Sequence, residues 1–502
     1  MISQHIDPID YSRKWFVMSA LGMGVFLATI DASIVNVALP TLVTQFTARF
    51  EVVQWVVLGY LLTLATLMLS IGRLADIVGK KPIYLAGMFI FTFGSLLCGL
   101  SQTVFWLIGF RIFQAVGAAM MISLGTGILT EAFPPQERGK ALGIIGVIVS
   151  IGIITGPTLG GFLIDLISWH WIFFVNIPVG IIGSFMVIRF LPKVKAIQGQ
   201  RFDFWGAASL FISLLSFLLA LTLGQKIGFT HPQIVTLFIT WAICFVLFLV
   251  TELAVKQPMV DLRLFRNQLF NLSLFTGFIT FVSTGGIILL MPFYLENVLG
   301  YNPHQVGLML AIVPISAGLI SPLSGTLSDR FGTRPVSTFG LFIMLIGYIS
   351  LLSLSTQTTS LGYILRFFPV GLGIGIFQSP NNSAIMGSAP REKLGIVSSL
   401  LSLTRTLGQS SGIAAIGAFW AFRTAIYAGG NNGSGATRAA SSAQVGALQD
   451  TFTAVAIMMS LTFLLSLWTL IQERVRYGCC SRFAKVKDFA LTVEHIEDAE
   501  KK

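Results

Sequence analysis

Two segments of this 502-residue chain decide its fold, because they repeat one pattern. The first is GRLADIVGKKP at residues 72–82, and the second is GTLSDRFGTRP at residues 325–335. They align without a gap, with glycine, leucine, aspartate, glycine and proline at matching places. Each segment lies between two long apolar runs, so one kind of connection occurs twice. The chain therefore contains an internal repeat, a feature to establish before a fold is assigned.

The composition around these segments is that of a membrane protein. Hydrophobic residues make up 54% of the chain and charged residues only 11%, whereas a soluble domain carries about 25% charged residues. So few charges cannot cover the surface of a soluble protein of this size. Soluble enzymes, nucleic-acid binders and disordered proteins are excluded. The net charge of +11 must therefore have another cause than nucleic-acid binding.

Apolar runs predict fourteen membrane-spanning helices, since each crossing needs about 20 mostly apolar residues. They fall near residues 15–37, 53–72, 83–101, 104–130, 140–164, 171–191, 205–224, 233–253, 270–295, 304–324, 336–355, 360–383, 395–420 and 452–472. The repeat distance from residue 72 to residue 325 exceeds one six-helix unit, which leaves room for two inserted helices. We therefore expect an all-α protein with six, two and six helices.

This division predicts five parts of the chain. A cytoplasmic N-terminus at 1–14 precedes a six-helix bundle at 15–191. A linker with two more helices at 192–265 leads to the second bundle at 266–472, and a charged cytoplasmic tail follows at 473–502.

The basic residues indicate the orientation, because cytoplasmic loops carry the excess of Lys and Arg. With both termini in the cytoplasm, the external loops hold only four of the 32 basic residues, namely Arg49, Lys226, Arg423 and Arg438. Arg111, Arg366 and Arg405 lie inside predicted helices. The basic excess is thus a topology signal, not a nucleic-acid signal. We expect a multi-pass protein of the plasma (inner) membrane.

These motifs resemble a known family. Parallel six-helix repeats are the plan of the major facilitator superfamily, and residues 72–82 resemble its signature between the second and third helices. LATIDASIVNVALP at 27–40, QWVVLGYLL at 54–62 and WIFFVNIP at 171–178 resemble the first, second and sixth helices of the 14-spanner drug:proton antiporters. The resemblance implies a multidrug efflux permease.

Asp31 is the acidic residue that lies well inside an apolar run. An ionised carboxylate there costs about 3 kcal/mol or more, so it indicates a functional site. Burial disfavours the charged form of a carboxyl group, and a group that gains and loses a proton is what a proton-coupled carrier needs. The alternative is a structural Asp that ties helices together by hydrogen bonds.

Arg111 is the predicted partner of Asp31. It begins RIFQAVGAA at 111–119, which resembles the fourth-helix motif of the family, whose Arg is implicated in proton transfer. The alternative is an Arg that satisfies backbone carbonyls. Arg366 is its counterpart in the second half, but the position that corresponds to Asp31 is Thr284, so the proton site is predicted in the first half.

The fifth helix carries glycines at every fourth position, which permit close helix approach. The segment GIITGPTLGG at 152–161 resembles the antiporter motif of exporters, and Pro157 bends the helix beside the glycines. Ordinary small-residue packing also explains the stripe alone. The predicted antiporter residues are Gly152, Gly156, Pro157, Gly160 and Gly161.

Two further sets of residues are candidates. Apolar surfaces with a few polar groups suit amphipathic ligands, although polar side chains also bridge helices; the substrate candidates are Asn36, Gln54, Trp55, Tyr60, Gln114, Gln378, Asn381 and Asn382. The repeated segments are predicted to close the cytoplasmic side through charge pairs and helix-end contacts, although their basic residues also set topology. The gating candidates are Gly72, Arg73, Asp76, Gly79, Lys80, Lys81, Asp329, Arg330 and Arg334.

The sequence therefore predicts a proton-coupled antiporter that exports hydrophobic or amphipathic small molecules by alternating access. No P-loop, metal-ligand spacing or nucleophile–base pair indicates an enzyme, a metal or a cofactor, and the energy source is the proton gradient. Alternatives are an exporter of one metabolite, such as a siderophore, glycoside or lipid, and, less favoured, an importing symporter. The expected partners are the small-molecule substrate, protons and the bilayer, without nucleic acid; a periplasmic adaptor protein, used by some relatives, stays open.

Overall fold

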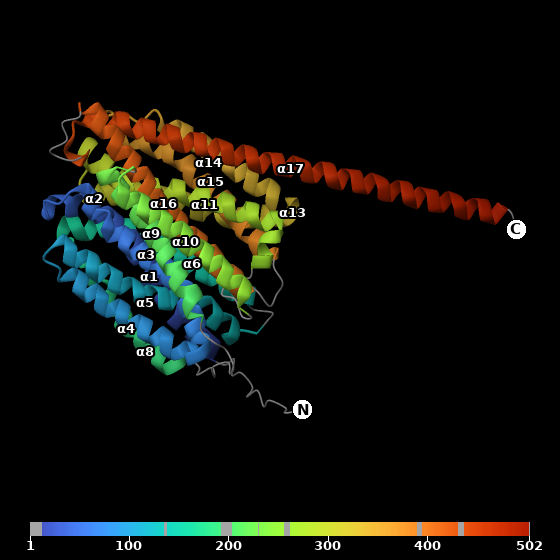
Figure 1. Ribbon diagram of the computed structural model, residues 1–502, viewed down its shortest axis with the longest axis horizontal. Helices are drawn as coiled ribbons and strands as arrows, with labels where there is room; N and C mark the ends of the chain where they lie inside the picture. Colours follow the sequence, from blue (N-terminus) through green and yellow to red (C-terminus); the bar gives the residue numbers. More distant parts are fainter. Residues whose placement is uncertain are drawn as a thin grey trace.

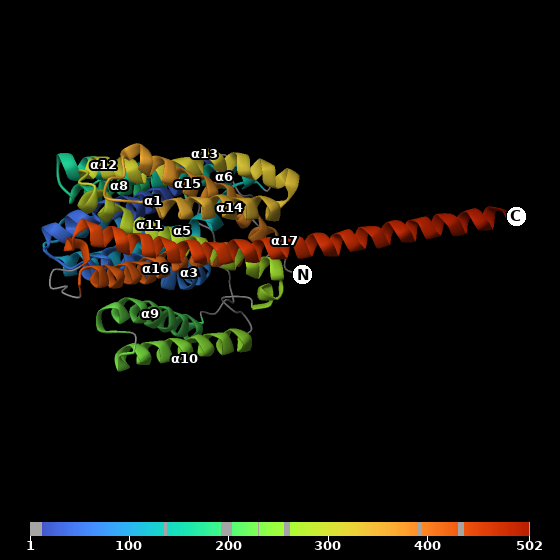
Figure 2. The ribbon, with the colours of Figure 1, turned by 90° about the horizontal axis from the view of Figure 1, so that it is seen from above.

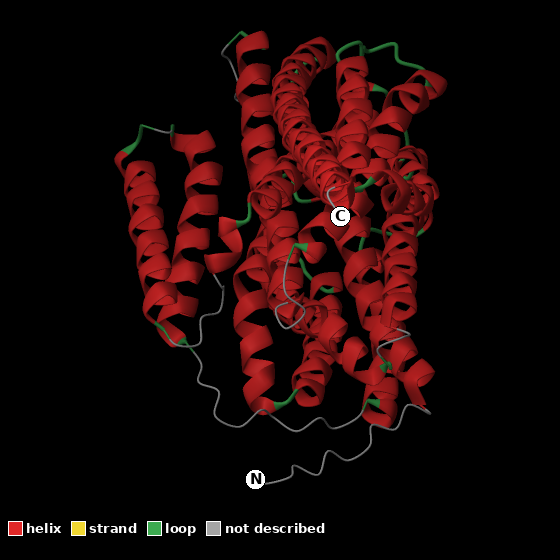
Figure 3. Cartoon of the chain, turned by 90° about the vertical axis from the view of Figure 1, so that its right-hand side faces the viewer, coloured by secondary structure: helices red, strands yellow, loops and turns green. Residues whose placement is uncertain are grey.

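The protein is a helical bundle. The computed structural model describes residues 13–134, 138–191, 203–228, 230–255, 262–388, 394–429 and 436–500, and these contain helices and no strands (Figures 1 and 3). Within them, 13 helices are long and apolar enough to cross a membrane. The remaining predicted span, at 395–420, falls in α16 (Leu394–Tyr427), which has 34 residues. The predicted fold of two six-helix bundles and two inserted helices is confirmed.

The first bundle contains eight helical segments, two of them single turns. They are α1 (Lys14–Gln45), α2 (Phe50–Val53), α3 (Trp55–Val78), α4 (Lys80–Gly99), α5 (Val104–Ala132), α6 (Arg138–Leu166), α7 (Trp171–Phe174) and α8 (Asn176–Phe190). The second bundle comprises α11 (Gln268–Phe293), α12 (Pro303–Leu310), α13 (Ile312–Phe331), α14 (Thr333–Leu351), α15 (Ser360–Gly387), α16 and α17 (Ser441–Glu500). Helix α17 continues well beyond the bundle (Figure 1).

The repeated segments form the same tight connection in both bundles. The loop expected after residue 72 is shorter than predicted, because α3 continues to Val78 and only Gly79 separates it from α4. Gly79 has φ 107° and Gly332, between α13 and α14, has φ 88°. These values lie in a region that glycine adopts without steric cost, which explains why both segments carry glycine there.

The two inserted helices form a hairpin at the side of the bundles. Helices α9 (Phe204–Ile227) and α10 (Pro232–Ala254) pack against each other, and α9 also contacts α3 and α16 (Figure 2). An apolar cluster with Ala65, Leu214 and Leu403 holds α9 in place. Helix α10 keeps many apolar side chains exposed, as expected for a surface that faces lipid.

The two bundles meet toward the end that the sequence predicts to be external. The ring of Phe50 lies 5.1 Å from Phe293 and 5.3 Å from Trp420, centroid to centroid. Glycines also bring α6 and α12 into close contact, with Gly161 against Pro303. These contacts place the seam between the bundles near the connections at 46–54 and 299–302.

Candidate functional site

Asp31 lies at the centre of a buried hydrogen-bond network inside the first bundle. Its side chain is 0% exposed. Arg111 of α5 donates from Nη1 to Oδ2 of Asp31 at 2.5 Å. Gln114 Nε2 of α5 and Asn176 Nδ2 of α8 each donate to Oδ1 at 2.9 Å. The carboxylate thus accepts from three donors, one of which is its counterion Arg111, and these contacts join α1, α5 and α8.

A second layer of contacts orients the donors around Asp31. Gln114 accepts from Arg111 Nη1 at 2.7 Å and donates to Ser95 Oγ of α4 at 2.7 Å. Arg111 Nε donates to the carbonyl of Val56 at 3.2 Å, and its guanidinium lies 4.1 Å from the ring centroid of Tyr60. Arg111 is therefore held by backbone, ring and carboxylate together.

This arrangement makes the burial of Arg111 depend on the charge of Asp31. A proton on Asp31 neutralises one member of the pair and leaves Arg111 buried without its counterion, which is costly in a low-dielectric interior. The site then gains from moving α5 relative to α1, or from letting water or another anion reach the guanidinium. The network thus ties the charge balance of Asp31 and Arg111 to the contact between α1 and α5.

Ser95 and Asn176 are part of this network, although neither is among the site residues predicted from the sequence. Asn176 begins α8 within the segment 171–178, and Ser95 lies on α4. A signal was present, because a buried carboxylate needs several donors. Their distance along the chain, 145 residues between Asn176 and Asp31, hid which polar residues supply them.

The glycine stripe of α6 packs against α1, on the helix that carries Asp31. A side chain at Gly152, Gly156 or Gly160 would collide with Thr29, Ser33 or Ile34 respectively. Ser33 Oγ also donates across the contact to the carbonyl of Gly152 at 3.1 Å. The expected close approach is present, and it holds the backbones of α1 and α6 together one turn to either side of Asp31.

The predicted substrate residues do not form one surface in this structure. Gln114 is bonded to Asp31, Tyr60 lies against Arg111, and Gln54 lies in the seam beside Gly417. Asn36 Nδ2 donates to Ala32 in its own helix, and Asn381 Nδ2 donates to Ser273 of α11. These five are buried in this structure, and their contribution to a substrate surface stays a prediction. Half-buried side chains remain at Trp55, Gln378 and Asn382.

The gating candidates are distributed around the helix ends. Lys81 Nζ donates to the carbonyls of Ile188 and Leu191, at 2.9 and 2.5 Å, so it caps the C-terminal end of α8. Gly72 has open space around it and Arg330 is exposed, while Lys80 and Arg334 are half-buried. The side chains of Arg73, Asp76 and Asp329 lie outside the described residues.

Arg366 does not reproduce the arrangement of Arg111. It lies near the N-terminal end of α15, where Nε donates to Ser353 Oγ and Nη1 to the carbonyl of Gly362, each at 2.8 Å. Thr284, at the position that corresponds to Asp31, donates to the carbonyl of Thr280 in its own helix at 2.9 Å. The buried ion pair of the first bundle therefore has no counterpart at these two positions.

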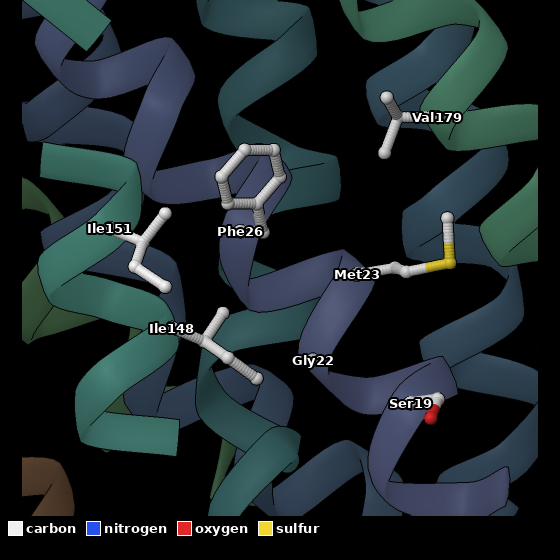
Figure 4. Close-up of a pocket in the computed structure, with 7 residues that line it drawn as sticks. All are labelled: Ser19, Gly22, Met23, Phe26, Ile148, Ile151 and Val179. Atoms are coloured by element: carbon white, nitrogen blue, oxygen red, sulfur yellow. The ribbon is translucent and has the colours of Figure 1, made fainter. Parts of the chain in front are cut away.

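Two cavities lie away from Asp31. One of about 360 Å³ is lined by apolar groups of α1, α6 and α8, including Met23, Phe26 and Ile151 (Figure 4). Another, of about 540 Å³, lies at the predicted outer end beside Trp169 and His170. Partial burial lowers the pKa of His170 below its usual value. Among the described residues no cluster of His, Cys, Asp or Glu could hold a metal ion.

Two repeated six-helix bundles in a membrane, with an ion pair buried in one of them, are the architecture of a transporter. The family model of the Major Facilitator Superfamily matches residues 21–413, and the chain belongs to this family. It is a multi-pass membrane transporter of small molecules, not an enzyme.

Relatives and solved structures agree with this family. The riboflavin transporter RibZ of Clostridioides difficile is 38% identical over 82% of this chain and 89% of its own length. The multidrug resistance protein Stp of Mycobacterium tuberculosis is 34% identical over 79% of this chain and 74% of its own. A bacterial homologue of the human lysosomal transporter Spinster has the same fold, with TM-score 0.64 and 18% identity over 92% of this chain and 98% of that one.

Proposed function

We propose that this transporter is a proton-coupled antiporter that exports hydrophobic or amphipathic small molecules across the cytoplasmic membrane, with both termini in the cytoplasm. One observation carries the proposal. Asp31 is fully buried in a membrane-spanning helix, and it is bonded to Arg111 and to two amide donors from other helices. An ionisable group at such a depth marks proton or ion pathways in transporters.

Alternating access follows from two ligands that each prefer a different state. A proton that reaches Asp31 from outside weakens its pair with Arg111 and favours one arrangement of α1 and α5. Substrate that binds from the cytoplasm favours loss of that proton and the other arrangement. Exchange is coupled only if each ligand has different affinities for the two states, and the pair supplies that difference for the proton.

The direction of transport is supported by the sequence. The segment 152–161 resembles the antiporter motif of exporters.

A second candidate function is transport of one particular metabolite. The relative that is 38% identical is named as a riboflavin transporter, whereas others are named for multidrug resistance. A narrow substrate range would need a fixed set of polar contacts, and a broad range an adaptable apolar surface. A panel of metabolites and drug-like compounds in one transport assay separates the two.

The test is proton-driven transport by the purified protein in liposomes. Asp31→Asn is expected to abolish export against a substrate gradient, because an amide cannot carry the proton. The matched control is Asp450→Asn, since Asp450 pairs with Arg423 at 2.5 Å near the ends of α16 and α17, away from Asp31. If Asp31→Asn exports uphill as the wild type does, the proposed mechanism is wrong.

A further inference from the structure

Arg405 is a second arginine inside a membrane-spanning helix, and it lacks the partners that Arg111 has. Among the described residues, no carboxylate forms an ion pair with it, and its buried Nε has no hydrogen-bond partner. Its guanidinium lies 5.2 Å from the ring centroid of Phe281 on α11. A charged group at this depth is expensive unless something compensates it, and no described carboxylate supplies that compensation.

The position of Arg405 on α16 directs it toward α11. Gly408 and Gly412 lie three and seven residues further on, on the same face of the helix, since successive residues turn by about 100°. Gly408 packs against the backbone of Phe278 and Gly412 against that of Val282, both on α11. Gly408 also lies against Cβ of Phe281, so Arg405, one turn before Gly408, lies beside the ring of Phe281 at the α11–α16 contact.

Phe281 lies on α11 between two neighbouring helices. Gly277, four residues earlier, faces Asn381 of α15, and Phe278, three residues earlier, faces Gly408 of α16. On a helical wheel, Phe281 falls between these two directions. Phe281 and Arg405 are both half-buried rather than enclosed, so a ligand can touch the ring and the guanidinium together.

The charge balance of the two bundles indicates what Arg405 and Phe281 can bind. Arg111 and Asp31 neutralise each other in the first bundle, so Arg405 adds a positive charge that no described carboxylate cancels. A planar guanidinium binds a carboxylate, phosphate or sulfonate through two parallel hydrogen bonds. The phenyl ring beside it offers an apolar face for the carbon skeleton of the same molecule.

We propose that Arg405 and Phe281 bind the anionic group and the adjoining aromatic part of the transported substrate, so that the substrates are amphipathic aromatic anions. The inference rests on the proposed export function and specifies its substrate class. Cationic amphipaths are disfavoured at this site, because the ligand would meet an uncompensated like charge.

The experiment measures binding to the full-length protein in detergent, without a proton gradient. Three probes share one ring system and differ in charge: 1-pyrenebutyrate, 1-pyrenebutanol and a 1-pyrenebutyl trimethylammonium salt. Wild-type protein is expected to bind the carboxylate about tenfold more tightly than the alcohol, since one hydrogen-bonded charge contributes about that factor. It is expected to bind the ammonium salt more weakly than the alcohol. Titration calorimetry gives each Kd.

The variants locate the preference at the proposed residues. Arg405→Gln is expected to remove the tenfold preference for the carboxylate over the alcohol, and an unchanged thermal unfolding transition reports that the variant is folded. Arg405→Lys keeps part of the preference, because it retains the charge but not the planar fork. Phe281→Leu weakens all three probes alike. The control is Arg366→Gln, whose arginine is bonded to Ser353 and Gly362, and it leaves the preference intact.

Two results would overturn the proposal. One is a wild-type protein that binds the three probes equally or prefers the cation, and this result needs no variant. The other is an Arg405→Gln variant that keeps the preference for the carboxylate. Neither touches the export function itself, which fails only if Asp31→Asn still exports uphill.

Discussion

The two six-helix bundles share one fold but differ in where they place charge. In the first bundle, Asp31 and Arg111 form a buried pair with bonded neighbours on every side. In the second, the equivalent position holds Thr284, and the arginine inside a helix is the half-buried Arg405, on a different helix and without a partner carboxylate among the described residues. The repeat sets the paths of the helices, while single side chains set the chemistry of each half. Proton binding is accordingly proposed for one bundle and anion recognition for the other.

The largest expected effect tests whether the first-bundle pair also holds the fold together. Asp31→Asn leaves the guanidinium of Arg111 buried without a counterion, which is expected to lower the free energy of unfolding by about 3 kcal/mol. The double variant Asp31→Asn with Arg111→Gln removes both charges and should recover most of that loss. Thermal unfolding in detergent measures both.

The same pair of variants separates stability from coupling. If the double variant regains stability yet still fails to export uphill, Asp31 is needed for the proton and not only for packing. Recovery of proton-driven export by the double variant would contradict the proposed role. Arg366→Gln is the control from the second bundle, expected to change stability by less than about 0.5 kcal/mol, because its bonded partners lie at a helix end.

A smaller effect is expected from the glycines that both bundles use for close packing. Gly156→Val on α6 collides with Ser33, and Gly412→Val on α16 collides with Val282. Each is expected to cost about 1–3 kcal/mol, the usual range for overpacking. Gly146→Val, on the same helix as Gly156 but with nothing nearby, is the control. Equal losses of stability from Gly156→Val and Gly412→Val would show that both bundles depend on close glycine packing. A loss from Gly156→Val alone would show that only the first bundle does.

The smallest effect concerns the helix end that Lys81 caps. Lys81→Met removes a cation from the carbonyls of Ile188 and Leu191. A cation at a helix C-terminus contributes about 0.3–1 kcal/mol, so Lys81→Met should lower the free energy of unfolding by that amount. The control is Arg330→Met in the second repeat, because the side chain of Arg330 is exposed. If Arg330→Met lowers the free energy of unfolding as much as Lys81→Met does, capping of α8 does not explain the effect of Lys81.

Part of the candidate site could be predicted and part could not. Asp31 and Arg111 stood out because ionisable groups are rare in apolar helices, and the structure brings them together. Gln114 was assigned to the substrate surface, yet it faces Asp31 inside the bundle. The face of α5 to which it belongs depends on which helices surround α5, and a single helix with apolar residues on all sides does not reveal that.

Hydropathy and the repeat at 72–82 and 325–335 were enough to establish the class of protein, the helices and their internal symmetry. These properties are local, since each helix must span the bilayer and satisfy its own backbone hydrogen bonds. The partners of Asp31 from α4 and α8, and the absence of a partner carboxylate for Arg405 among the described residues, were decided only by tertiary structure. Whether a buried polar group is satisfied depends on contacts between distant segments, and hydropathy carries no information about those contacts.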